Sequence, residues 1–149
     1  MPIAAVPATT HMEADSEARD RTRLPAWETV AAALLAIAYA SLAAGVLFYR
    51  HAHFHTAAFD LGLLGQASWN SLQGRPFATT ILPWNYLAEH CAPVLALLSP
   101  FFLLWSDIRV LLLAGAVAGG LAGLGVYAIA EIRGASRPAA LLVQAAFYL

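Results

Sequence analysis

The chain has 149 residues, of which 60% are hydrophobic and only 11% are charged, and its formal net charge at pH 7 is −1. Soluble domains carry about 25% charged residues, so this composition indicates a membrane protein. The near-zero net charge leaves no reason to expect a nucleic-acid partner. A single cysteine, Cys91, excludes a disulfide within the chain and a cysteine-only metal cluster.

The chain begins with a polar segment, residues 1–26, that is mixed in charge and rich in Ala, Pro and Thr. We expect it to be a disordered cytoplasmic segment and not a secretory signal peptide. The apolar run at residues 27–49 follows, and about 20 mostly apolar residues suffice to cross a bilayer. No convincing small-residue cleavage site comes after this run, so the sequence predicts a retained transmembrane helix.

A second apolar run, residues 110–130, contains no charged residue and is also long enough to cross a bilayer. A third run, residues 138–149, is too short, because a spanning helix needs about 17–25 residues. We interpret this run as the start of a truncated transmembrane helix, and therefore expect the chain to be an inactive fragment of a longer protein.

Arginine clusters lie before the first run and after the second, namely Arg19, Arg21 and Arg23, then Arg133 and Arg137. The positive-inside rule places both clusters in the cytoplasm. The sequence therefore predicts a multi-pass protein of the plasma membrane, with a cytoplasmic N-terminus and an outer loop at residues 50–109.

One stretch of this loop, residues 92–105, is itself apolar but is interrupted by Ser99 and Pro100. A helix of that length covers about 21 Å, which is less than the roughly 30 Å of the hydrocarbon core. We expect an interfacial or re-entrant helix. The alternative, a third span, would move Arg133 and Arg137 to the outer side.

The second spanning segment has a face of small residues. Gly115, Gly119 and Gly123 are four residues apart, and such spacing allows another helix to approach closely. This pattern indicates a helix within a larger bundle, although glycine is also simply frequent in membrane helices.

Residues 58–72 have a helical pattern of polar and apolar residues. The sequence predicts a helix that lies flat on the membrane, with Gln66, Asn70 and Gln73 facing the outer solution. Gly74, followed by Pro76, is expected to end this helix.

An acidic residue, Asp60, lies at the start of that predicted helix. It suits an N-cap, whose carboxylate accepts hydrogen bonds from backbone N–H groups. It equally suits a catalytic base that removes a proton from a hydroxyl, or a ligand of a divalent cation that binds a phosphate.

Histidine and arginine supply the other candidate groups of the loop. His51, His53 and His55 would share a face in an extended segment and could bind a transition metal, or could simply be solvated. His90 suits an acid, a base or a phosphate contact, or a bond to a backbone carbonyl. Arg75 suits a phosphate contact through its planar fork, or a lipid headgroup.

Four motifs in order, Phe59-Asp60-Leu61-Gly62, Gln66 with Trp69-Asn70, Gly74-Arg75-Pro76-Phe77, and His90-Cys91-Ala92-Pro93, resemble the signature of a domain-of-unknown-function family. Its members are polytopic prokaryotic membrane proteins, and the resemblance runs from about residue 49 to residue 149. No Walker loop, GxGxxG, HExxH or GxSxG motif occurs, so soluble nucleotide chemistry is not expected.

That family in turn resembles the GT-C membrane glycosyltransferases, which implies an all-α membrane bundle with short interfacial helices in the outer loop. By this resemblance Asp60 is the general base or a metal ligand, and His90 is a further catalytic candidate. Arg75, Gln66, Trp69 and Asn70 would bind substrate. The donor would be a polyprenyl-phosphate sugar at the outer face.

The chain departs from the GT-C motif at one position, and two alternative functions stay open. Many GT-C enzymes carry two adjacent acids where this chain has Phe59 and Asp60, which puts the divalent cation in doubt. The first alternative is a non-enzymatic membrane protein, either a transporter component or a scaffold. The second is a metal sensor at the outer surface that uses the three histidines.

Overall fold

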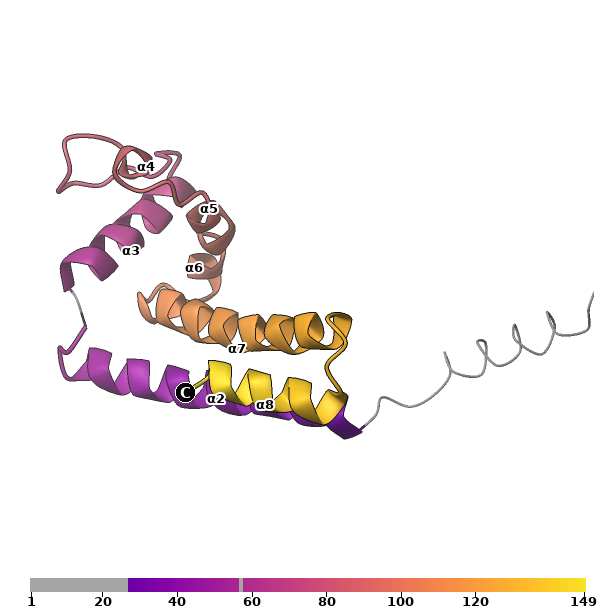
Figure 1. Cartoon of the computed structure of the whole chain (residues 1–149). Helices are drawn as coiled ribbons and strands as arrows, with labels where there is room; N and C mark the ends of the chain where they lie inside the picture. The colour runs from indigo at the N-terminus through magenta and orange to yellow at the C-terminus, as the bar shows by residue number, and fades with distance from the viewer. Residues whose placement is uncertain (1–26, 57) are drawn as a thin grey trace, which may run out of the picture.

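The computed structural model describes residues 27–56 and 58–149, and in these ranges the chain is helical without any strand (Figure 1). The all-α fold class is thereby confirmed. The interpretation of residues 1–26 as a disordered segment falls outside the described residues. The helices are α2 (Trp27–Ala52), α3 (Ala58–Leu72), α4 (Tyr86–Glu89), α5 (Val94–Leu98), α6 (Phe101–Leu104), α7 (Arg109–Ile132) and α8 (Arg137–Phe147).

Three of these helices, α2, α7 and α8, lie alongside one another as a bundle (Figure 1). Helix α2 has 26 residues and α7 has 24, and both are long and apolar enough to cross a membrane. Helix α8 has 11 residues and follows α7 after a short turn. Gly134 has a φ of +88° in this turn, a conformation that glycine adopts without strain.

Small residues allow the two long helices to approach closely. A Cβ atom on Gly120 would lie 2.9 Å from the carbonyl oxygen of Ala36 and 3.2 Å from the Cβ of Ala40. Gly119 faces the ring of Tyr39, and Gly123 lies against the ring of Tyr148. The glycine-rich face of α7 thus packs within this chain, against α2 and against the end of α8.

Hydrogen bonds fix α8 to both long helices. The Gln144 side chain is fully buried, and its Nε2 donates to the carbonyl oxygen of Ala32, 3.0 Å away. The Tyr148 hydroxyl donates to the carbonyl oxygen of Gly120 at 2.6 Å, and its ring stacks on Tyr39 with centroids 4.2 Å apart. Polar side chains that bond across helices in this way stabilise membrane bundles.

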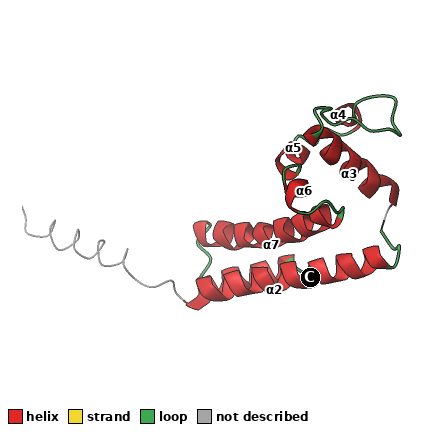
Figure 2. Ribbon diagram, turned by 180° about the vertical axis from the view of Figure 1, so that it is seen from behind, coloured by secondary structure: helices red, strands yellow, loops and turns green. Residues whose placement is uncertain are grey.

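Helices α3 to α6 form a second body, which we call the cap (residues 58–108). The cap lies at the end of the bundle where α2 ends and α7 begins (Figures 1 and 2). Its core consists of Leu63, Ala67, Tyr86 and Leu95, so α3 packs against both α4 and α5.

The apolar stretch expected as one helix over residues 92–105 is divided into α5 and α6. Helix α5 ends at Leu98 and α6 begins after Pro100, whose missing N–H cannot continue a helical ladder. Together the two pieces are shorter than either long helix of the bundle.

Helix α3 covers the predicted range, but the prediction for its faces is wrong at Asn70. This residue was expected to face the outer solution, whereas its exposed fraction is only 9%. The loop after α3 folds back over this side of the helix, and such a covering cannot be read from periodicity. Trp69, one residue earlier, is 42% exposed.

Candidate functional site

The amide side chains of α3 hold the loop that follows it. Gln66 Oε1 accepts hydrogen bonds from the backbone N–H of Thr80 at 3.0 Å and from its hydroxyl at 3.2 Å. Asn70 Nδ2 donates to the carbonyl oxygen of Ala78 at 2.8 Å, and its Oδ1 accepts from Arg75 Nη2 at 3.0 Å. Three residues predicted to bind substrate, Gln66, Asn70 and Arg75, therefore make structural contacts.

The far end of this loop is held in the same way. Asn85 Oδ1 accepts from the backbone N–H of Leu87 and caps α4, while its Nδ2 donates to the carbonyl oxygen of Pro76 at 2.7 Å. The backbone N–H of Phe77 donates to Ser71 Oγ at 2.9 Å. The Gly-Arg-Pro-Phe motif thus forms a turn that is bonded to α3 and to the start of α4.

We predict that Asn70→Ala loosens this loop. The change removes the two side-chain hydrogen bonds by which Asn70 holds this loop and should cost about 1–3 kcal/mol of cap stability. Amide hydrogen exchange across residues 73–85 measures the effect, and faster exchange is expected there with little change in α7. Gln73→Ala, which alters an exposed amide three residues away, is the matched control. Equal exchange in both variants would contradict the role of Asn70.

Asp60 occupies the first turn of α3 as its third residue, so it lies inside the helix and not at the N-cap position. A carboxylate in the first turn is stabilised by the positive end of the helix dipole. Asp60 is exposed and lines an open cavity of about 310 Å³ together with Arg50, His55 and Thr56. The cavity also has apolar walls, formed by Leu47, Leu61, Leu64 and Leu112.

The end of α2 and the turn that follows it supply the other polar residues that line this cavity. Arg50 Nη2 donates to the carbonyl oxygen of His55 at 3.3 Å, and His51 Nδ1 lies 3.1 Å from Thr56 Oγ1. Phe54 has a φ of +58° in this turn. Arg50 was not among the predicted site residues, although its position as the first cation after the first apolar run could have indicated it.

The three alternating histidines do not lie in an extended segment. His51 belongs to the last turn of α2, and His53 Nδ1 donates to the carbonyl oxygen of Tyr49 at 2.8 Å. Within residues 27–56 and 58–149, no group of three or more His, Cys, Asp or Glu side chains is placed to hold a metal ion. The geometry assumed for a histidine metal site is therefore absent there.

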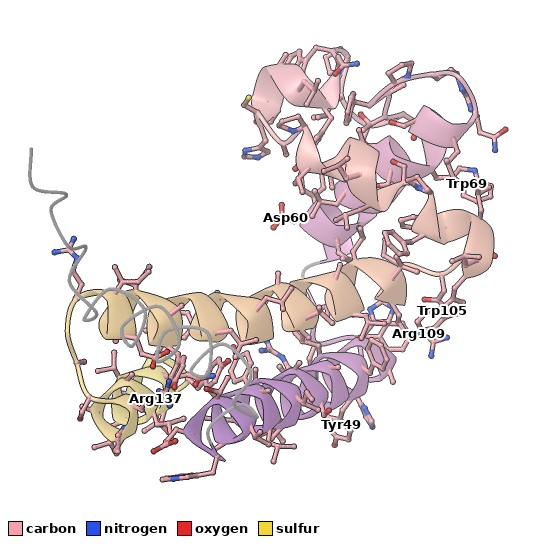
Figure 3. All side chains as sticks on the ribbon, turned by 90° about the vertical axis from the view of Figure 1, so that its right-hand side faces the viewer. Tyr49, Asp60, Trp69, Trp105, Arg109 and Arg137 are labelled. Carbon is pink, nitrogen blue, oxygen red and sulfur yellow. The ribbon has the colours of Figure 1, made fainter. Side chains whose placement is uncertain are left out.

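The remaining predicted site residues lie elsewhere on the cap. Figure 3 shows Asp60 and Trp69 on opposite sides of it. His90 is exposed and its ring centroid is 5.5 Å from that of Tyr86. Burial raises the pKa of the Tyr86 hydroxyl, and the charges of Asp60 and Glu89 raise this pKa further. None of Trp69, Arg75 and His90 lines the cavity that contains Asp60.

An ion pair lies where the cap joins α7. Arg109 Nε and Nη2 donate to the Asp107 carboxylate at 3.0 Å and 2.6 Å, and the guanidinium carbon is 5.3 Å from the centroid of the Trp105 ring (Figure 3). The hydrogen bonds from Arg109 lower the pKa of Asp107 to about 2. Because this pKa lies below its ordinary value, the pair is intact above about pH 4 and is lost only as the pH falls through 2.

The part of the chain that includes the cap, α7 and α8 matches a known protein family. A family model described as "Predicted membrane protein (DUF2079)" matches residues 50–149. No curated protein matches the chain, and no solved structure does. The matched range agrees with the range over which the motifs resemble a domain-of-unknown-function family.

Proposed function

We propose that this chain, which belongs to the DUF2079 family of predicted membrane proteins, acts in a membrane glycosyltransferase that takes its sugar from polyprenyl phosphate at the outer face of the plasma membrane. The observation that carries the proposal is the cavity shared by Asp60 and Arg50. The transfer needs a base that takes a proton and a cation that stabilises a phosphate. A carboxylate and a guanidinium, which stays protonated, are both present in this open cavity.

Asp60 is the general base in the proposed reaction. An acceptor hydroxyl oxygen attacks the anomeric carbon of the sugar and passes its proton to the Asp60 carboxylate. The bond between this carbon and the phosphate oxygen breaks, and polyprenyl phosphate leaves with the electron pair. Arg50 stabilises the negative charge on the leaving phosphate, because a guanidinium binds phosphate oxygens through its planar fork. A divalent cation, if the reaction uses one, would have Asp60 as a ligand.

The position of the cavity supports a substrate with a lipid tail. The cavity lies where α2 ends and the cap begins, and α2 and α7 are both long and apolar enough to cross a membrane. A donor whose tail lies in the bilayer must meet its enzyme at such a boundary between apolar helices and polar side chains.

The other predicted site residues take different roles in this proposal. Gln66, Asn70 and Arg75 shape the cap through their hydrogen bonds to its loop and to each other. His90 and Trp69 are exposed and would contact substrate only at a distance from the Asp60 cavity. Asp60 and Arg50 therefore carry the chemistry.

The test uses the complete protein, purified into lipid vesicles and supplied with radiolabelled polyprenyl-phosphate sugars. Transfer of label to an acceptor fraction is the expected result. Absence of transfer from every polyprenyl-phosphate sugar tried would reject the glycosyltransferase and favour the alternative, a non-enzymatic membrane protein such as a transporter component or a scaffold.

The outer location of the cap is tested with the natural cysteine. Cys91 is the only cysteine of the chain and is exposed on the cap. A membrane-impermeant maleimide added to intact cells should label Cys91 without permeabilisation. Cys91→Ser is the control that must abolish labelling of this segment. Labelling that appears only after the membrane has been opened would place the cap in the cytoplasm and overturn the proposed topology.

A further inference from the structure

Two phenylalanines have a left-handed backbone conformation, and only one of them is held there by packing. Within residues 27–56 and 58–149, the non-glycine residues with a positive φ are Phe54, at +58°, and Phe77, at +54°. Residues with a Cβ atom rarely adopt this conformation, because the Cβ comes too close to the backbone. The ring of Phe77 packs against the core of the cap, which offsets this cost. Phe54 is 94% exposed, so packing does not explain its conformation.

The conformation of Phe54 comes from the way in which α2 ends. The backbone N–H of His55 donates to the carbonyl oxygen of Arg50 at 2.8 Å, and that of Phe54 donates to the carbonyl oxygen of His51 at 3.1 Å. These two hydrogen bonds form a Schellman motif, in which Phe54 stands at the position that glycine usually occupies. Glycine would adopt this conformation without strain. An exposed aromatic ring that is held here against its backbone preference points to a role in binding.

The turn after α2 places this ring beside the cavity of Asp60. The neighbouring cavity, of about 430 Å³, is lined by Phe54 together with His51, Thr56, Leu61, Gly62 and Ile108. Thr56 and Leu61 also line the cavity of Asp60, so the two cavities share a wall. Arg50 lines the cavity of Asp60 as well. A ligand whose phosphate lies at Arg50 can therefore extend into the cavity beside Phe54.

The polar groups around the Phe54 ring favour a sugar over a hydrocarbon chain. His51 and Thr56 line the cavity of about 430 Å³, with Nδ1 of the histidine 3.1 Å from Oγ1 of the threonine. Phe54 also lines a further cavity, of about 270 Å³, together with the ion pair of Asp107 and Arg109. Polar and charged groups are unfavourable next to lipid tails, whereas they form hydrogen bonds with sugar hydroxyls. The negative face of an aromatic ring attracts the C–H groups of a sugar ring.

We propose that Phe54 stacks on the sugar ring of the polyprenyl-phosphate donor, in the cavity next to Asp60 and Arg50. The inference rests on the proposed function and adds the residue that contacts the sugar. The phosphate lies at Arg50, the sugar ring lies on Phe54, and the anomeric carbon between them faces Asp60. Glycine at position 54 would then give a protein that is more stable but less selective for the sugar.

Thermal unfolding of the complete protein in detergent tests whether the Phe54 ring supports the fold. Phe54→Gly removes the strain and loses little packing, so its midpoint should rise by about 2 °C or more. The matched control, Phe77→Gly, removes the same strain but also takes a ring out of the cap core, and its midpoint should fall. A midpoint for Phe54→Gly at or below that of the wild type would overturn the inference.

Native mass spectrometry tests the sugar contact by comparing sugar-free polyprenyl phosphate with its glucosyl and mannosyl forms. Phe54→Gly should weaken binding of a sugar-bearing lipid by about three- to tenfold and leave binding of the sugar-free lipid unchanged. Phe54→Tyr keeps an aromatic face and should bind both kinds of lipid as the wild type does. Equal weakening for all three lipids, or no weakening for either sugar-bearing one, would refute the contact.

The outcome for Phe54 is separable from the outcome for sugar transfer, because binding is measured without an acceptor. A selective loss in Phe54→Gly, without transfer by the wild type, would retain the sugar contact and reject the glycosyltransferase. Transfer by the wild type, together with unchanged binding by Phe54→Gly, would retain the enzyme and reject the sugar contact.

Discussion

Replacing Asp60 by Asn is expected to lower the rate of sugar transfer by about 10²- to 10⁴-fold, the contribution of a positioned general base. The amide has nearly the size of the carboxylate but cannot take the proton from the acceptor hydroxyl. Asp60 is exposed in the first turn of α3, so the loss of its charge should disturb the fold little. The fall should appear in kcat, with a small change in the KM for the donor.

Two further variants make the Asp60 experiment decisive. Glu89→Gln neutralises another exposed carboxylate of the cap, one that accepts a hydrogen bond from Trp84 Nε1, and should retain transfer. Asp60→Glu keeps the basic group and should retain part of the rate. An Asp60→Asn protein with unchanged kcat would remove this residue from the chemistry. A fall of equal size in Glu89→Gln would indicate an effect of cap charge in general.

The substitution Gly120→Ala should lower the stability of the bundle, because Gly120 lies at the contact between α2 and α7. The Cβ of Gly120→Ala would meet the backbone carbonyl of Ala36 at 2.9 Å, and a backbone atom cannot swing aside as a side chain can. Helices α2 and α7 must then separate, and overpacking of this kind costs about 1–3 kcal/mol. The carbonyl of Gly120 also accepts the Tyr148 hydroxyl, so its displacement loosens α8 as well.

Gly115→Ala is the matched control, because no atom lies within 4 Å of the Cβ that it adds to the same helix. There the gain in helix propensity, up to about 1 kcal/mol, is unopposed. Thermal unfolding in detergent micelles, followed by far-ultraviolet circular dichroism, should give a lower midpoint for Gly120→Ala and an equal or higher one for Gly115→Ala. Equal lowering by both substitutions would refute the close contact as the cause.

The parts of the fold that follow from local chemistry could be predicted from the sequence. Long uninterrupted apolar runs predicted the two long helices, and the predicted helix over residues 58–72 coincides with α3 (Ala58–Leu72). Pro100 interrupts the next apolar stretch, and the structure divides there into α5 and α6. In each case the deciding interaction lies within a few residues along the chain.

The parts that depend on distant contacts could not be predicted. Asn70 has the polar character of a surface residue, and only the return of the loop to Ala78 makes it buried. Arg50 joins Asp60 because a turn brings the end of α2 beside the start of α3. Whether His90 or Trp69 contacts substrate stays a prediction, and so does the membrane orientation of the cap.

The hydrogen bond from Gln144 to the carbonyl oxygen of Ala32 has a consequence for the order in which the protein is made. The two residues are 112 positions apart, so the first long helix leaves the ribosome well before its partner side chain exists. All of the cap is synthesised in that interval and can fold around its own core, since proteins fold in units as synthesis proceeds. Closure of the bundle then waits for α8, so the contact between α8 and α2 forms only after the whole cap has been made.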